Sequence, residues 1–189
     1  ATDKNEVVVN GWSPSKRNGK FANSGWVTEI GEKEWKEFAQ HGALAGLKFQ
    51  KSIEEKAYQL GGGQSKVPAQ NLTDFLADRP SATLNKTSYH PGVTPADLNT
   101  LYPHDVTYRL REGLREMTKK LNGFNHELAI VTAPESRTSA PVRIPRTAMF
   151  CHPEIQNLFP CGEGAGYAGG IISAALDGFR VVQAINELK

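Results

Sequence analysis

The sequence has no long apolar segment and almost no excess of charge of either sign. Its 189 residues include 22 Lys and Arg against 20 Asp and Glu, which leaves a net charge of +2. A helix that crosses a bilayer needs about 20 consecutive apolar residues, and no segment approaches that length. Non-specific nucleic-acid binding depends on a basic excess that is also missing here. We therefore expect neither a membrane nor a nucleic acid among the partners.

Potential metal ligands and nucleophile motifs are equally sparse. The two cysteines, Cys151 and Cys161, cannot supply a four-thiolate site, and the five histidines form neither an i, i+4 pair nor a His-Glu-x-x-His motif. We expect no metal. Residues 1–9 lack the charged start and apolar stretch of a signal peptide, which predicts a cytoplasmic protein with both thiols reduced.

Several short segments carry the β-branched and alternating pattern of strands. They are residues 6–10, 26–30, 128–132, 142–144 and 157–159. Residues 67–75 are ambiguous because Pro68 has no N–H to donate within a sheet, which favours an edge strand or an irregular segment.

Other segments have helical spacing. Residues 32–60 end at three consecutive glycines, a stripe of apolar residues runs from Pro103 to Gly123, and residues 171–188 form an apolar final helix. Residues 94–97 have the composition of a helix start. Strands and helices alternate without a regular βαβ rhythm, so the sequence predicts an α+β fold with a mixed sheet and flanking helices, followed by a terminal strand, a Gly-rich turn and a helix.

The most informative segment is residues 159–175, in which five glycines lie between a predicted strand and a predicted helix. Glycine lets a ligand approach the backbone, and the first turn of a helix presents unpaired N–H groups to an electron-rich atom. Glu163 lies inside the turn, where its carboxylate can accept hydrogen bonds from sugar-like hydroxyl groups. A turn whose small residues only permit close packing is the alternative interpretation.

A second candidate region is the loop 133–141 between two predicted strands. It carries Glu135, Arg137 and Ser139, which are the weak candidates for contact with a substrate or a flavin. An arginine in such a position can bind a carboxylate or stabilise a reduced flavin. A structural salt bridge between Arg137 and Glu135, or a solvated turn, explains the pattern equally well, and no catalytic base can be assigned.

Three segments, residues 61–75, 135–144 and 158–172, resemble the C-terminal half of a family of uncharacterised bacterial FAD-dependent dehydrogenases. The similarity extends from the first predicted strand to the last predicted helix. The resemblance implies that residues 1–150 form a substrate-side α+β domain, and that residues 151–189 belong to an FAD-binding domain whose N-terminal half is missing from this chain.

The resemblance also implies roles for six residues of the Gly-rich turn: Gly162, Glu163, Gly164, Gly169, Gly170 and Ile171 would bind FAD. Glu163 would meet the ribityl chain, and the amides near Gly170 and Ile171 would meet the O2 side of the flavin. NAD(P) is a further cofactor that the family leaves open. The partners implied are the N-terminal half and an unknown small-molecule substrate.

Two functions therefore stand beside each other. The chain is expected to be the C-terminal portion of an FAD-dependent oxidoreductase, inactive by itself because the dinucleotide fingerprint of the N-terminal half is absent. The alternative is a non-catalytic binding or interaction module with a structural Gly-rich turn. The start at Ala1, a few residues before a predicted strand, favours a cut within a longer protein.

Overall fold

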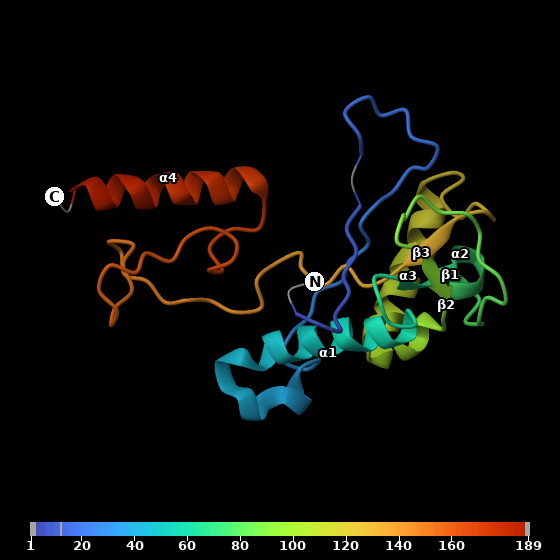
Figure 1. The fold of residues 1–189 in the computed structure, drawn as a ribbon, viewed down its shortest axis with the longest axis horizontal. Coiled ribbons are helices and arrows are strands. Elements are labelled where there is room, and N and C mark those ends of the chain that lie inside the picture. The colour runs from blue at the N-terminus through green and yellow to red at the C-terminus, as the bar shows by residue number, and fades with distance from the viewer. Residues whose placement is uncertain (1–2, 12, 188–189) are drawn as a thin grey trace. The chain divides into compact units, whose positions relative to one another are not determined.

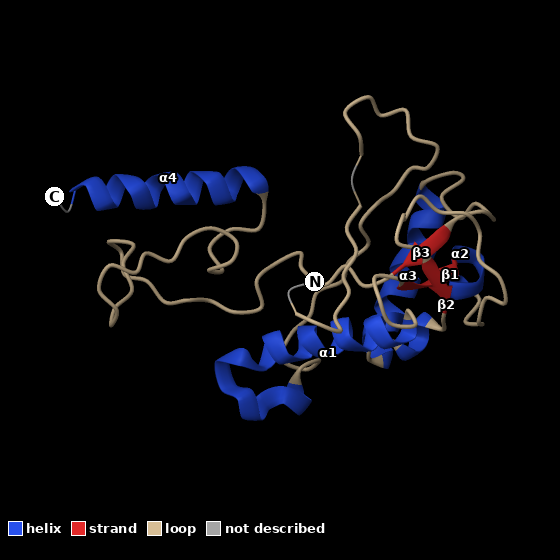
Figure 2. Ribbon diagram, in the orientation of Figure 1, coloured by secondary structure: helices blue, strands red, loops and turns tan. Residues whose placement is uncertain are grey.

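The computed structural model describes residues 3–11 and 13–187 and divides into two compact units. The first unit contains the residues up to 37 together with residues 49–136, and the second contains residues 38–48 and the residues from 137 onward. A small sheet and several helices lie in the first unit, whereas helix and long loops make up the second (Figures 1 and 2). The α+β prediction is confirmed.

The sheet has three short strands in the order β2-β1-β3. The strands are β1 (Val67–Asn71), β2 (Val93–Pro95) and β3 (Ile130–Thr132). β2 runs parallel to β1, with Val67 opposite Val93, and β3 runs antiparallel to it, with Gln70 opposite Val131. The sheet is therefore mixed, as the sequence predicted.

The prediction that Pro68 lies in an edge or irregular segment is wrong, because β1 is the central strand. The flanking residues Val67 and Ala69 face β2, where Val67 donates to Gly92 and Ala69 accepts from Ala96. Pro68 faces β3 one residue beyond its end, and only its carbonyl is used, accepting from Ala133 at 3.2 Å. A central strand tolerates this proline because no acceptor requires its missing N–H.

The first helical region begins later than predicted. A 3₁₀ segment, η1 (Lys36–Leu44), precedes helix α1 (Ala45–Leu60), and Gly42 interrupts η1 with a φ of 54°. The predicted end is confirmed: Gly62 and Gly63 have positive φ, and their N–H groups bond to Gln59 and Tyr58 in a Schellman cap.

Two further helical elements separate β1 from the longest helix of the first unit. Helix α2 (Leu72–Leu76) follows β1 directly, and a single 3₁₀ turn, η2 (Leu98–Thr100), is capped by the Asp97 carboxylate. The helix start predicted at residues 94–97 is therefore misplaced, since Thr94 and Pro95 belong to β2.

Helix α3 (His104–Lys120) confirms the predicted apolar stripe, with Val106 and Leu114 buried. Trp26 anchors it by donating from Nε1 to the Leu110 carbonyl at 3.1 Å. The core of the first unit also contains nearly fully buried residues from α1, β1, α2 and η2, and the residue that follows η2: Phe49, Ile53, Ala57, Val67, Ala69, Leu72, Phe75, Leu98 and Leu101.

Four predicted strands are not strands in the structure: residues 6–10, 26–30, 142–144 and 157–159. Their backbone hydrogen bonds are isolated and do not form a ladder. For example, Val9 donates to the Pro134 carbonyl at 2.8 Å, and Ile144 donates to the Ala165 carbonyl at 3.2 Å. A β-branched pattern favours an extended backbone, but a strand also needs a neighbouring edge over several residues.

The final helix, α4 (Ile171–Glu187), agrees with the prediction for residues up to 187; residue 188 lies outside the described part of the chain. It follows the Gly-rich turn, which no strand precedes. Asp177, Val181 and Ala184 form its buried side. None of the helices within residues 3–11 and 13–187 is both long enough and apolar enough to cross a membrane.

Candidate functional site

The Gly-rich turn is closed by its own backbone hydrogen bonds. Gly166 donates to the Glu163 carbonyl at 2.9 Å, and Tyr167 donates to the Gly162 carbonyl at 3.0 Å. Gly162 and Gly166 both have left-handed backbone conformations, with φ of 69° and 82°. These φ values explain why glycine occupies both positions, because a side chain there is strained.

A buried ion pair, which the sequence analysis missed, holds the turn against α4. Arg146 Nη1 and Nη2 donate to the two carboxylate oxygens of Asp177 at 2.9 and 2.7 Å, and Nη1 also reaches the Pro160 carbonyl at 2.9 Å. The Asp177 carboxylate accepts a further bond from the Gly162 N–H at 2.9 Å. The side chains are only 11% and 9% exposed. Bidentate geometry and low exposure make this a strong charge-assisted contact.

Aromatic rings complete the surroundings of Arg146. The guanidinium carbon lies 3.6 Å from the centroid of the Tyr167 ring and 4.7 Å from that of Phe150. Arg143 lies over the same Tyr167 ring at 4.3 Å, and the Tyr167 hydroxyl donates to the Ile144 carbonyl at 2.9 Å. The cation is therefore held by π contacts as well as by its carboxylate.

The electrostatic consequence is a strongly acidic Asp177. Its hydrogen bonds from Arg146, reinforced by the Gly162 amide and the positive charge of Arg146, lower its pKa to about 2. In the same way, the carboxylate raises the pKa of Arg146. Both groups therefore stay ionised across the physiological range. The signal that could have found this pair is an acid within the apolar final helix, but its partner lies 31 residues away in sequence.

The three candidate residues of loop 133–141 do not all lie in the same unit. Glu135 lies in the first unit, next to its last residue, and its carboxylate lies against Gly25. Arg137 and Ser139 are exposed residues of the second unit. The pKa of the Tyr102 hydroxyl is raised, mainly by burial and further by the negative charge of Glu135. Ser136, the neighbour of Glu135, donates to the buried carboxylate of Glu54 at 2.7 Å.

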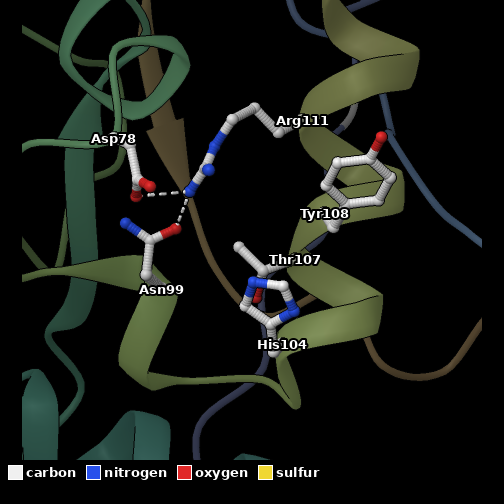
Figure 3. Close-up of a pocket in the computed structure, with 6 residues that line it drawn as sticks. All are labelled: Asp78, Asn99, His104, Thr107, Tyr108 and Arg111. Atoms are coloured by element: carbon white, nitrogen blue, oxygen red, sulfur yellow. Dashed lines mark hydrogen bonds and ion pairs between the residues drawn. The ribbon is translucent and has the colours of Figure 1, made fainter.

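The first unit also has a small cavity that the sequence did not indicate. It lies between the end of α2, η2 and the first turns of α3, and its volume is about 110 Å³. Polar side chains line it: Asp78, Asn99, His104, Thr107, Tyr108 and Arg111 (Figure 3). No group of three or more His, Cys, Asp or Glu within the described residues is arranged to hold a metal ion.

Comparison with known proteins identifies the family. Residues 1–138 match the family described as "FAD-dependent protein, C-terminal domain-like". The chain belongs to this family. It is also 40% identical to an uncharacterized protein of Clostridium beijerinckii, an alignment that covers 99% of this chain and 35% of the relative. The chain thus spans about a third of the length of that relative, and the alignment includes the Gly-rich turn and α4, which lie beyond the residues matched by the family.

The start of α4 leaves backbone donors and open space beside the Gly-rich turn. Among the described residues, none accepts a hydrogen bond from the backbone N–H of Gly170 or Ile171. A Cβ built at Gly164 or Gly169 would meet no atom within 4 Å. The Glu163 carboxylate likewise has no partner within the described chain. Of the six predicted residues, only Gly162 has its amide occupied, by Asp177.

Proposed function

We propose that this chain is the C-terminal portion of an FAD-dependent oxidoreductase of the cytoplasm, a dehydrogenase. Residues 1–150 contribute the substrate side, and residues 151–189 complete the flavin site that an N-terminal half of the same protein begins. The observation that carries the proposal is the pair of backbone amides at Gly170 and Ile171, from which none of residues 3–11 and 13–187 accepts a hydrogen bond. They lie beside glycines with open space, in a chain of an FAD-dependent family.

Each residue of the turn has a distinct part in this proposal. The Gly170 and Ile171 amides would donate to the O2 side of a bound flavin, where the helix N-terminus also places partial positive charge. Glu163 would accept from a ribityl hydroxyl. Gly164 and Gly169 leave room for the ligand, and Gly162 forms the turn while Asp177 holds its amide.

When bound, FAD would supply hydride transfer at N5 to or from an unknown small-molecule substrate, with NAD(P) as a second nucleotide. The chain itself binds and orients. Glu135, Arg137 and Ser139 are the candidates for substrate contact, and the Arg137 guanidinium suits a carboxylate group. Alone, the chain holds too little of the site for catalysis.

The proposal is tested by flavin occupancy in the full-length parent. Gly170→Trp places a large side chain at the amide and should lower FAD affinity at least tenfold, about 1.4 kcal/mol. Glu163→Ala should lower it by a smaller factor because one hydrogen bond is lost. FAD absorbance per protein after gel filtration, and titration of the apoprotein, measure both.

Glu154→Ala is the matched control, since Glu154 is an exposed acid of the same unit that lies outside the turn. It should leave occupancy at the wild-type value. Unchanged flavin occupancy in both turn variants would show that the turn is structural. That alternative, an interaction module without catalysis, is favoured by the close packing at Gly166, where a Cβ would lie 2.7 Å from the Val142 carbonyl.

The exposed side of α4 supports the proposal that a further part of the protein is the partner. Large apolar side chains that share one face of the helix are more than half exposed: Ile171 at 89%, Ile172 at 73%, Leu176 at 53%, Phe179 at 63% and Val182 at 56%. A continuous apolar face of this kind marks an interaction site. Because the relative is almost three times as long as this chain, we assign the face to the N-terminal half of the parent.

A single charge on this face should prevent that association. Phe179→Asp replaces a large apolar contact with a desolvated carboxylate, and should weaken binding between this chain and the separately produced N-terminal half by at least 100-fold, about 2.7 kcal/mol. Analytical ultracentrifugation measures the complex. Leu128→Asp is the matched control, because Leu128 is 61% exposed but lies in the first unit. Equal weakening by both variants, or self-association of this chain through Phe179, would refute the assignment.

A further inference from the structure

The cavity of the first unit shares no residue with the Gly-rich turn, and its polar lining has no part in the proposed flavin site. Arg111 is a charged lining residue whose side chain is only 11% exposed, against 59% for its partner Asp78. The guanidinium lies over the Phe75 ring at 5.5 Å, so one side of it is covered by an aromatic ring. A buried cation needs acceptors on most of its N–H groups.

The protein satisfies only part of that requirement. Arg111 Nη2 donates to the Asp78 carboxylate at 2.7 Å and to the Asn99 side-chain oxygen, which uses both of its hydrogens (Figure 3). Nε is buried and has no acceptor. Nη1 makes no hydrogen bond within the described residues. Unlike Nε, it is accessible to solvent. The Nη1 group of the guanidinium is therefore available to donate to a ligand.

Local structure, rather than Arg111, holds the two acceptors in place. Asp78 has a left-handed φ of 57° at the end of α2, where Asp78 and Arg79 donate to the Phe75 and Asp74 carbonyls in a Schellman cap. Glycine or asparagine normally occupies that position. The amide of the Asn99 side chain is fixed by a bond to Asp97 at 2.8 Å. The two acceptors therefore hold the Arg111 guanidinium in a fixed orientation before any ligand binds.

Two exposed side chains of α3 border the opening. His104, Tyr108 and Arg111 are spaced by four and three residues and therefore share one face of the helix. The His104 side chain is 93% exposed and Tyr108 is 55% exposed, so both can contact a ligand without first breaking a packed core. The N-cap of α3, Pro103, has no side-chain acceptor, and the one acid of the first turn, Asp105, is paired with Lys33.

We propose that this cavity binds a small monocarboxylate, with a carboxylate oxygen accepting from Arg111 Nη1 and the remainder lying against Tyr108 and His104. The single charge follows from the lining: Asp78 already balances part of the Arg111 charge and would repel a dianion. The size follows from the volume of about 110 Å³, which admits only a few non-hydrogen atoms. The inference is independent of the flavin site.

Titration with sodium acetate, followed by the backbone amide NMR signals of the ¹⁵N-labelled protein, tests this proposal. Sodium chloride at equal ionic strength is the reference. We expect saturable shifts at Asn99, Thr107 and Tyr108, lost in Arg111→Gln. Asp78→Asn keeps the left-handed backbone and an oxygen acceptor while removing the competing charge, so it should tighten acetate binding about fivefold, or about 1 kcal/mol.

Tyr108→Ala tests the same contact should Arg111→Gln fail to fold, because Tyr108 is exposed and its removal costs little packing. This substitution should lower the affinity for acetate at least twofold. The proposal is overturned by shifts that do not saturate, by equal shifts in Arg111→Gln, or by weaker binding in Asp78→Asn. Inorganic phosphate at pH 8 is mainly a dianion and should bind more weakly than acetate. Tighter binding of phosphate than of acetate would contradict the proposal that the ligand is a monocarboxylate.

Discussion

Asp177→Ala should destabilise α4 and the Gly-rich turn by about 3 kcal/mol, because it leaves the Arg146 cation buried without its counter-ion. The substitution also removes the acceptor of the Gly162 amide. Hydrogen exchange of amides 171–187 is the measurement, and exchange should accelerate roughly 100-fold. Amides of β1 in the first unit provide an internal reference that should change far less.

The double variant Arg146→Met with Asp177→Leu separates charge from shape. It removes both ions together, so most of the lost stability should return. Failure of the double variant to recover any protection would mean that the hydrogen bonds to Gly162 and Pro160, rather than the unpaired charge, dominate the energy.

The pH dependence of the same exchange follows from the lowered pKa of Asp177. In the folded protein this pKa is about 2, below the ordinary value of 3.8. Protonation therefore favours the unfolded form, and the stabilisation is present above pH 3.8 and is lost as the pH falls toward 2. The loss is about 2 kcal/mol. Asp177→Asn should flatten the profile of α4 in this range.

Gly166→Ala should cost about 3 kcal/mol in the stability of the second unit. Two effects combine: φ is 82°, which costs an L-residue roughly 1–2 kcal/mol, and the new Cβ would lie 2.7 Å from the Val142 carbonyl oxygen. The carbonyl belongs to backbone and cannot turn aside as a side chain would. Circular dichroism of denaturant unfolding, combined with exchange of amides 171–187, measures the loss.

Gly164→Ala is the control within the same turn. Gly164 is not in the left-handed region, and its Cβ would meet nothing within 4 Å. The change should lie within about 0.5 kcal/mol of wild type. Equal destabilisation by both alanines would show that the turn tolerates no side chain at all, and that the position-specific contacts of Gly166 are not responsible.

The two longest helices, α3 and α4, followed closely from the sequence because helical periodicity is local. Val106 and Leu114 repeat within one helix, and three glycines end α1 by a cap that involves only adjacent residues. The predictions for the strands failed more often. Residues 26–30 have the alternation of a strand, yet they have no partner edge, and Trp26 instead packs on α3 through its indole.

The candidate site also has a local part, which the sequence indicates, and a part that depends on long-range contacts. The glycines, Glu163 and the start of α4 could be predicted, since the turn and the helix are contiguous in sequence. The Arg146–Asp177 pair and the Arg111 cavity could not, because each joins side chains from separate elements. Pro68 shows the same limit: its sequence argued for an edge, and only the register with β3 allowed it in the centre.

By itself the sequence determined the class of the fold, the helices and the glycine turn, all of which depend on residues within about one helical turn of each other. The tertiary structure alone decided which amides of that turn are closed and which are open, since a hydrogen bond from Gly162 to Asp177 requires α4 to fold back beside the turn. Long-range pairing depends on chain geometry, which local patterns do not encode.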